Sequence, residues 1–201
     1  MSKITGAGIL ILESYFGKPV VTLFGNNNKS FGDLGGFKDR GETPEKTGYR
    51  EGREESCNLI YIKPNDLKKY STITQVHEYK VFILYIKNLS YQDYKNNMIQ
   101  IHNTCKKRSW KETSEMIRVN LDDIVYAVTK RIKLVKDING IDRVIKDRTR
   151  RIIRENYVKL YNLVNNYHPI LLKRQKIIQS RMPCLIGTIS YSISPFKNIR
   201  I

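Results

Sequence analysis

Three glutamates spaced for one face of a helix are the residues of this chain best suited to chemistry. Glu51, Glu54 and Glu55 stand at positions i, i+3 and i+4, so a helix here projects their carboxylates from one face within a single turn. Like charges at these steps repel one another. A hard divalent cation is the natural partner, because Mg²⁺ takes oxygen ligands and bridges readily to substrate phosphates. The segment therefore predicts a metal site for a phosphate-containing substrate.

A glycine-rich segment precedes this helix. Glycines recur from Gly32 to Gly41, and they allow the backbone to approach an anion closely before the chain turns into the helix. Thr43 and Pro44 predict the start of the helix, because threonine caps free N–H groups and proline is tolerated in the first turn. We expect the helix to end near Cys57. Loop and helix together predict a site for a metal-complexed pyrophosphate.

The charged residues of this loop and helix resemble the Nudix box. In that family the box reads Gly, five residues, Glu, seven residues, Arg-Glu, two residues and Glu-Glu, and it closes on a glycine and an aliphatic residue. The resemblance is specific for about residues 30–60 and is compatible with the strand order expected over 1–135. The matching positions are Gly36, Glu42, Arg50, Glu51, Glu54 and Glu55.

Departures from the box occur where the family has packing residues. Gly52 stands at an aliphatic position, Cys57 at the closing glycine and Asn58 at the last aliphatic position. Gly48 and Gly52 lie inside the expected helix, where each glycine costs roughly 1 kcal/mol relative to alanine. We therefore expect tertiary contacts along this edge to stabilise the helix. Cys57 replaces a glycine, the residue that best suits a positive φ.

The resemblance implies a fold, a reaction and a metal. The fold is α/β: a Nudix-type α/β/α sandwich around a mixed sheet, here with a basic helical C-terminal extension. The reaction is hydrolysis of a nucleoside diphosphate linked to another group, with Mg²⁺ or Mn²⁺ as cofactor. By the same resemblance, Glu51, Glu54, Glu55 and the backbone carbonyl of Gly36 would hold the metal.

Four further residues receive roles from the resemblance. Arg50 would orient a helix glutamate by ion pairing, and Glu42 would support the loop or an outer metal. Family members also commonly use a glutamate beyond the box as metal ligand or base. Two residues are candidates for that role, Glu115, which we prefer slightly, and Glu112; a plain surface position is the competing interpretation for either one.

Positive charge is concentrated in the second half of the chain. Residues 101–201 hold 22 basic and 8 acidic residues, against 14 and 11 in the first half, and the formal net charge is +17. Apolar residues recur at helical spacing over 143–167, which predicts a long amphipathic helix with a basic face. Such a face favours polyanions, although a merely solvated face is the alternative. The expected nucleic-acid contacts are Arg148, Arg150, Arg151 and Arg154.

The remaining pattern predicts the order of elements and two regions. We expect a domain over 1–135 and a basic, mainly helical extension over 136–201 that packs on the domain or continues it. Strands are predicted over 4–15, 19–24, 58–62, 79–86 and 116–119, turns over 26–28 and 137–140, and helices from 122 and over 171–181.

The charge asymmetry favours a capped RNA 5′ end over a small nucleotide as substrate, because the many phosphates of RNA bind more tightly to a continuous basic surface. The bias toward isoleucine, asparagine, lysine and tyrosine resembles that of large DNA viruses, some of which encode Nudix decapping enzymes. Two alternatives stay open. One is a small-molecule hydrolase of free nucleotides, dinucleoside polyphosphates or diphosphoinositol phosphates, and the other is an RNA-binding protein with an inactive box.

Cysteine usage and the N-terminal segment point to an intracellular protein. Three cysteines are too few and too widely spaced for a disulfide scaffold or a CxxC metal site. The longest apolar run of the first fifteen residues is too short for a signal peptide or a membrane span. We expect a cytoplasmic protein, in the host cytoplasm if it is viral, with no membrane partner.

Overall fold

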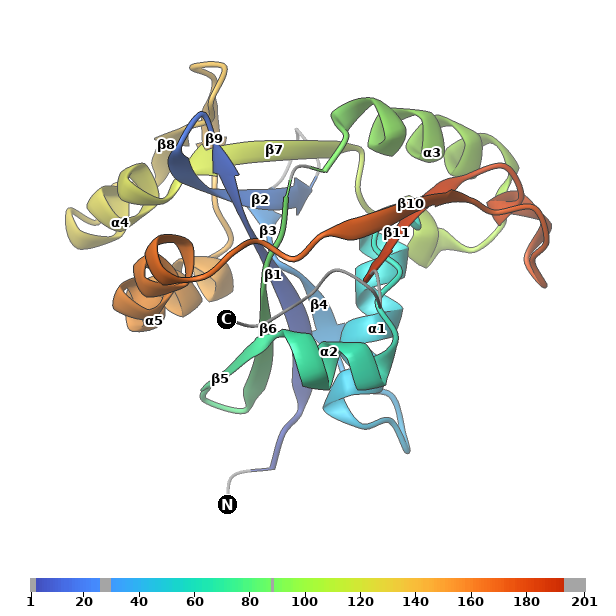
Figure 1. Ribbon diagram of the computed structural model, residues 1–201, viewed down its shortest axis with the longest axis horizontal. Helices are drawn as coiled ribbons and strands as arrows, with labels where there is room; N and C mark the ends of the chain where they lie inside the picture. Colours follow the sequence, from blue (N-terminus) through green and yellow to red (C-terminus); the bar gives the residue numbers. More distant parts are fainter. Residues whose placement is uncertain (1–2, 26–29, 88, 194–201) are drawn as a thin grey trace.

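A seven-stranded mixed sheet forms the centre of the molecule (Figure 1). The computed structural model describes residues 3–25, 30–87 and 89–193. The strand order is β3-β2-β1-β6-β5, with β4 paired to β1 and β7 paired to β2, and β1 and β6 run parallel. The strands are β1 (Gly6–Tyr15), β2 (Lys18–Gly25), β3 (Phe31–Gly32), β4 (Leu34–Phe37), β5 (Thr72–Val76), β6 (Tyr79–Tyr85) and β7 (Glu115–Asn120).

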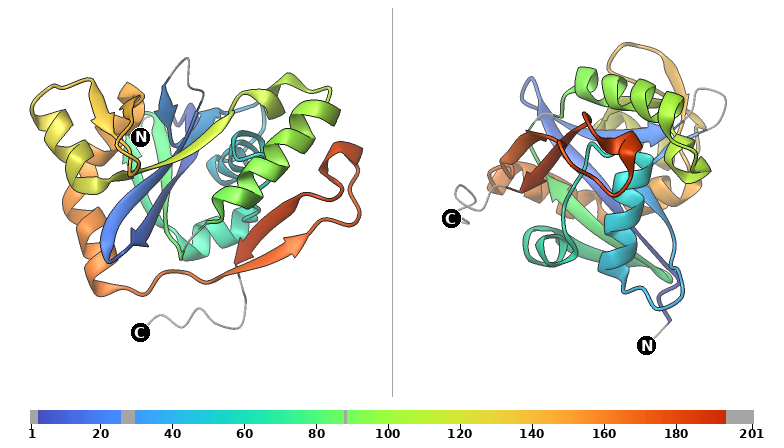
Figure 2. Two further views of the ribbon diagram at one scale, coloured as in Figure 1. Left: turned by 90° about the horizontal axis from the view of Figure 1, so that it is seen from above. Right: turned by 90° about the vertical axis from the view of Figure 1, so that its right-hand side faces the viewer.

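Helices cover both faces of this sheet, as the two views of Figure 2 show. One face packs against α1 (Pro44–Glu55), α2 (Pro64–Tyr70) and α3 (Tyr91–Thr104), and the other against α4 (Leu121–Thr129) and α5 (Asp147–Asn166). Side chains alternate along β1 as the pleat requires: Ile9 and Ile11 enter the first core, Leu10 and Leu12 the second. The expected α/β/α sandwich is confirmed.

Helix α1 is built as its sequence predicts. The side chain of Thr43 accepts a hydrogen bond from the backbone of Lys46 at 3.4 Å, and proline occupies the first turn. A Cβ on Gly52 would lie 2.8 Å from Cδ1 of Ile9, so the helix approaches β1 more closely than a larger residue allows. Beyond the helix, Cys57 takes φ 51°, the left-handed backbone that glycine would favour at this position.

The predicted basic helix is α5, and it belongs to the sandwich. Ile152, Ile153 and Leu160 are fully buried in the second core. The segment before it forms a hairpin of β8 (Leu134–Lys136) and β9 (Asp142–Val144) around the predicted turn. A domain boundary at residue 135 stays a prediction, and the residues that follow it contribute directly to the core.

Two predicted elements are wrong. The expected strand over 58–62 is irregular, with one isolated bridge between Ile60 and Tyr191. The expected helix over 171–181 is instead β10 (Leu172–Lys176), which pairs with β11 (Ile189–Ile193) after a 3₁₀ turn, η2 (Pro183–Leu185). Long-range pairing of the β10 backbone with β11 overrides the local helix propensity of this segment. The turn expected at 26–28 lies outside the described residues.

Several elements lack a sequence prediction: α2, α3, β5 and β11, together with β3 and β4, which lie in the glycine-rich segment expected as a loop. Helix α3 begins at Ser90, whose hydroxyl accepts from the Asp93 backbone at 3.1 Å, and it buries Tyr94 and Ile101. It leads to the short η1 (Arg108–Lys111), which packs near α1. Among the helices of the described residues, none is long and apolar enough to traverse a bilayer.

Candidate functional site

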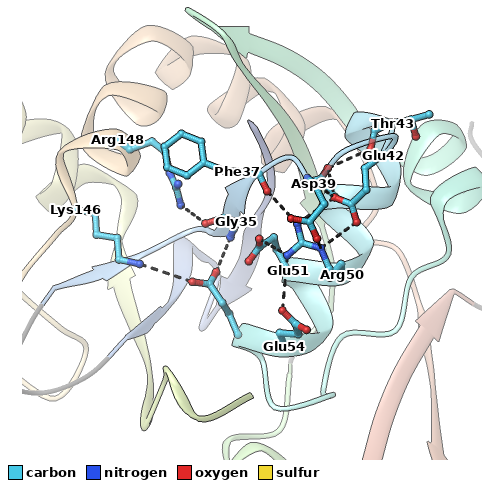
Figure 3. Close-up of polar contacts among 12 residues, drawn as sticks. Gly35, Phe37, Asp39, Glu42, Thr43, Arg50, Glu51, Glu54, Lys146 and Arg148 are labelled. Atoms are coloured by element: carbon cyan, nitrogen blue, oxygen red, sulfur yellow. Dashed lines mark hydrogen bonds and ion pairs between the residues drawn. The ribbon is translucent and has the colours of Figure 1, made fainter. Parts of the chain in front are cut away.

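Two glutamates of α1, Glu51 and Glu55, face the backbone of β4, where the glycine-rich segment runs, and Glu54 lies beside Arg50 (Figure 3). The backbone N–H of Gly35 donates to Oε2 of Glu55 at 2.5 Å. A Cβ on Gly36 would lie 2.5 Å from Oε1 of Glu51, so a larger residue here would displace that carboxylate. The structure thus places Gly36 beside Glu51, and binding of a metal by its carbonyl stays a prediction.

Arg50 holds the other side of the cluster. Its guanidinium donates to both carboxylate oxygens of Glu42 at 3.0 Å, to Oε1 of Glu51 at 2.6 Å and to the carbonyl of Phe37 at 2.9 Å. Nη1 also lies 3.7 Å from Oε2 of Glu54. Such planar, charge-assisted contacts fix geometry strongly. Arg50 and Glu42 thus position the glutamates and the loop, as the resemblance implies.

Burial without sufficient compensating charge raises the pKa of all three helix glutamates. Desolvation raises the pKa of Glu55 to about 8; the Lys146 cation opposes this, while the charges of Glu51 and Asp33 add to it. Desolvation likewise raises the pKa of Glu51 and of Glu54, against the opposing charge of Arg50. The site therefore favours an additional cation.

The start of α5 completes the site from the opposite face of the sheet. Nζ of Lys146 lies 3.9 Å from Oε1 of Glu55. Asp33 is buried and accepts from the hydroxyls of Thr149 at 2.6 Å and Tyr79 at 2.9 Å, and Nε of Arg148 donates to it at 3.2 Å. Long-range contacts of this kind leave no local signal in the sequence, which explains why Asp33 and Lys146 are missing from the predicted site.

Of the two outer candidates, Glu112 contributes negative charge to the surroundings of the helix glutamates. The negative charge of Glu112 contributes to the raised pKa of both Glu51 and Glu54. Glu115 instead forms a two-pronged ion pair with Arg143, at 2.6 and 3.1 Å. Glu115, at the start of β7, is thus directed to the β8–β9 hairpin, and the role of metal ligand or base stays a prediction for both residues.

The four predicted nucleic-acid contacts divide into two groups. Arg148 lies over the ring of Tyr79, 4.5 Å from its centroid, and donates to the carbonyl of Gly35 at 2.8 Å, so it is a member of the central site. The other three line a cavity of about 520 Å³ between α4, α5 and the segments around β8 and β9. Its cations are Arg131, Lys133, Arg150, Arg151 and Arg154, and Asp147 is its one acidic residue.

A divalent metal fits the chemistry of this donor set. Carboxylate oxygens are the ligands that Mg²⁺ and Mn²⁺ prefer, and three glutamates with raised pKa values, one buried and two half-buried, gain from a cation. Within the described residues, no three acidic, histidine or cysteine side chains are gathered closely enough to hold an ion as they stand. The residues that would hold a metal are Glu51, Glu54 and Glu55.

Known proteins resemble this chain in structure and not in sequence. No protein-family model matches the chain, and neither does any curated protein sequence. The Caenorhabditis elegans Ap4A hydrolase superposes with a TM-score of 0.45 at 16% identity, covering 79% of this chain and 98% of that one. The NUDIX domain of Shewanella oneidensis NrtR, solved with ADP-ribose, gives a TM-score of 0.46 at 11% identity, covering 80% and 90%.

A third Nudix structure gives a similar picture. The Mycobacterium smegmatis Nudix hydrolase RenU has a TM-score of 0.44 at 12% identity, covering 81% of this chain and 90% of that one. Because these overall scores are low, the relation rests on the box and on the topology. With the box glutamates on α1, the glycines on β4 and a mixed sheet between two helical layers, the chain has the fold of the Nudix hydrolases.

Proposed function

We propose that the chain is a divalent-metal-dependent Nudix pyrophosphohydrolase, which cleaves a nucleoside diphosphate linked to another group. One observation carries this proposal: three glutamates with raised pKa values, Glu55 buried and Glu51 and Glu54 half-buried, lie on a single turn of α1 beside the glycines of β4. A structural helix gains nothing from such an arrangement. A site for a cation and a phosphate chain does.

Each residue of the site has a part in this reaction. Bound Mg²⁺ or Mn²⁺ would neutralise pyrophosphate oxygens and lower the pKa of a water molecule. Arg50 keeps Glu51 oriented, and the Gly35 N–H keeps Glu55 oriented. Glu112 is the better placed of the two outer candidates to take a proton from the attacking water, because it acts electrostatically on the same cluster.

Within this activity, we propose a capped RNA 5′ end as the preferred substrate. Five cations and one carboxylate line the cavity beside α5, and this excess of positive charge suits a chain of phosphates. Arg151 also lines a second cavity that includes Gly36. Arg151 therefore links the two cavities, and a strand of RNA would extend from the glycine segment to the basic cavity, farther than a free nucleotide.

A small-molecule substrate is the second candidate. Ap4A and ADP-ribose are named for two proteins of similar structure. The cations nearest the box, Lys146 and Arg148, are sufficient for a single diphosphate. An inactive box, the third interpretation, conflicts with the retention of all its charged residues.

A substrate panel separates these alternatives. The purified chain would be assayed with a capped RNA of about 20 nucleotides, a dinucleotide cap analogue, Ap4A and ADP-ribose, each with Mg²⁺ and with Mn²⁺. We expect the highest kcat/KM for capped RNA, because only RNA reaches the basic cavity. A higher value for the cap analogue or for Ap4A would overturn the RNA assignment, and no hydrolysis of any substrate would overturn the enzymatic one.

A further inference from the structure

A second cavity, of about 420 Å³, opens beside the glycine loop on the side of α5. Strand β4 contributes Gly36 and Phe37 to its wall, the turn between β5 and β6 contributes His77 and Tyr79, and α5 contributes Arg151. Its volume is within the range of small-ligand sites, about 300–1,000 Å³. The cavity shares Gly36 with the glutamate site, so a ligand here lies next to the box.

Phe37 is the unusual residue of this cavity. Its side chain is 84% exposed, although it follows three buried or half-buried residues of β4. Side chains alternate along a strand, and Gly36 faces Glu51 on the α1 side, so Phe37 faces the opposite side, toward the cavity. A large exposed aromatic side chain at a cavity rim is suited to stack on a planar ring.

The cations of the cavity are held in different ways. Arg148 is fixed between Asp33, the carbonyl of Gly35 and the ring of Tyr79, so its position is set before any ligand arrives. Arg151 is exposed and lines both cavities, and it forms no ion pair among the described residues. It is therefore available to a phosphate group. The side chain of Glu78, also at the rim, offers an acceptor for amino groups.

The geometry points to this cavity as the slot for a nucleobase of the substrate, with the base stacked on Phe37 and its phosphate bonded to Arg151. An aromatic face beside an unpaired arginine is the combination that binds single nucleotides of RNA, because stacking and phosphate contact act together. The inference rests on the proposed function, which it deepens by naming the recognition of the base. It also gives the exposed ring of Phe37 a physical reason.

Binding measurements with and without a base test the slot. The four ribonucleoside 5′-monophosphates and ribose 5-phosphate would be titrated into the metal-free protein and followed by NMR. Stacking is worth roughly 1–3 kcal/mol per base, so we expect Phe37→Ala to weaken the binding of a preferred monophosphate by about tenfold. The same variant should leave ribose 5-phosphate unchanged, and Phe37→Trp should retain binding of the base.

Phe16 provides the matched control. It is 90% exposed at the turn between β1 and β2, and it does not line the slot. Phe16→Ala should leave every titration unchanged. If Phe37→Ala binds all monophosphates as the parent does, or if parent binding of a base is no stronger than that of ribose 5-phosphate, the slot is refuted.

Failure of the slot is distinguishable from failure of the enzyme. Base-dependent binding through Phe37 in a protein that hydrolyses nothing would retain the slot and reject the pyrophosphohydrolase. Hydrolysis with an unchanged KM in Phe37→Ala, together with unchanged binding, would retain the enzyme and reject the slot. An increased KM for base-containing substrates with a nearly constant kcat supports both.

Discussion

Burial of Glu55 links the stability of the metal-free protein to pH. Its pKa is about 8 in the folded chain, against 4.5 for an ordinary glutamate. A carboxyl with a raised folded pKa binds its proton more tightly in the folded state, so the free energy of unfolding falls as pH rises from about 4.5 to about 8. The slope from one such proton is about 1.4 kcal/mol per pH unit.

We therefore predict that the melting temperature of the metal-free protein falls over this pH range, and that Glu55→Gln falls less. Glutamine keeps an acceptor for the Gly35 N–H but carries no titrating group. Melting curves from pH 5 to pH 8 with a chelator, compared between parent and variant, measure the effect. If the melting temperatures of parent and variant fall equally with pH, ionisation of Glu55 does not destabilise the folded state. Added Mg²⁺ should reduce the fall in the parent.

Glu112 and Glu115 separate catalysis from stability. We predict that Glu112→Gln lowers turnover by about 10²–10⁴-fold with little change in folding, as expected for loss of a general base. Glu115→Gln weakens the ion pair with Arg143 and should cost about 1–3 kcal/mol of unfolding free energy, with turnover retained. Turnover and chemical denaturation, measured on both variants, distinguish the two roles. A larger loss of turnover in Glu115→Gln would assign the general base to Glu115 instead.

At this scale, local spacing predicts the residues within the box. Gly36, Arg50 and Glu51 meet as expected, because a loop and a helix turn fix them within a short segment. Asp33 and Phe37 could not be predicted in the same way. Their partners lie on α5 and on the β5–β6 turn, and only the folded sheet brings these segments together.

Among the elements, α1 depends on close packing against β1. A Cβ added to Gly52 would lie 2.8 Å from Cδ1 of Ile9. This close approach leaves no space for the aliphatic residue that the Nudix box has at this position. We predict that Gly52→Leu destabilises the protein by about 1–3 kcal/mol through overpacking, despite its better helix propensity. Lys46→Leu, on an exposed position of the same helix, should be close to neutral. Urea denaturation measures both, and a more stable Gly52→Leu would refute the packing described.

Elements with amphipathic spacing are predictable, and those set by long-range pairing are not. The hairpin of β1 and β2, helix α1 and helix α5 follow from apolar periodicity, turn residues and caps. The segment of β10 reads as a basic helix, but β11 lies thirteen or more residues further on and supplies its hydrogen bonds. Arg174 of β10 then pairs with Asp93 of α3 at 2.7 Å, a contact without a local signal.

For the whole molecule, the charge asymmetry gives a salt-dependent prediction. Three of the cations in the basic cavity, Arg131, Arg150 and Arg154, do not line the proposed base slot. Changing all three to alanine should weaken capped RNA binding and reduce its dependence on salt, because fewer counterions are released. Hydrolysis of a dinucleotide cap analogue should change little. Affinity measured from about 50 to 200 mM salt provides the test.

A variant of equal charge controls for net charge alone. Lys63, Lys68 and Lys95 are exposed and lie at α2 and α3, on the other side of the sheet. Their replacement by alanine removes the same three charges and should leave both the affinity and its salt dependence near those of the parent. Equal effects of the two triple variants would mean that the basic cavity is a solvated face.

The central claim is that the clustered glutamates of α1 make this fold an enzyme. Its most direct test is turnover of the best substrate, with Mg²⁺ and with Mn²⁺, by Glu54→Gln and Glu55→Gln. Glu45→Gln, at the start of the same helix and paired with Lys80, is the control, and circular dichroism checks the fold. We predict that both site variants remain folded and lose turnover while the control stays active. Retention of most activity in the two folded site variants would contradict the account.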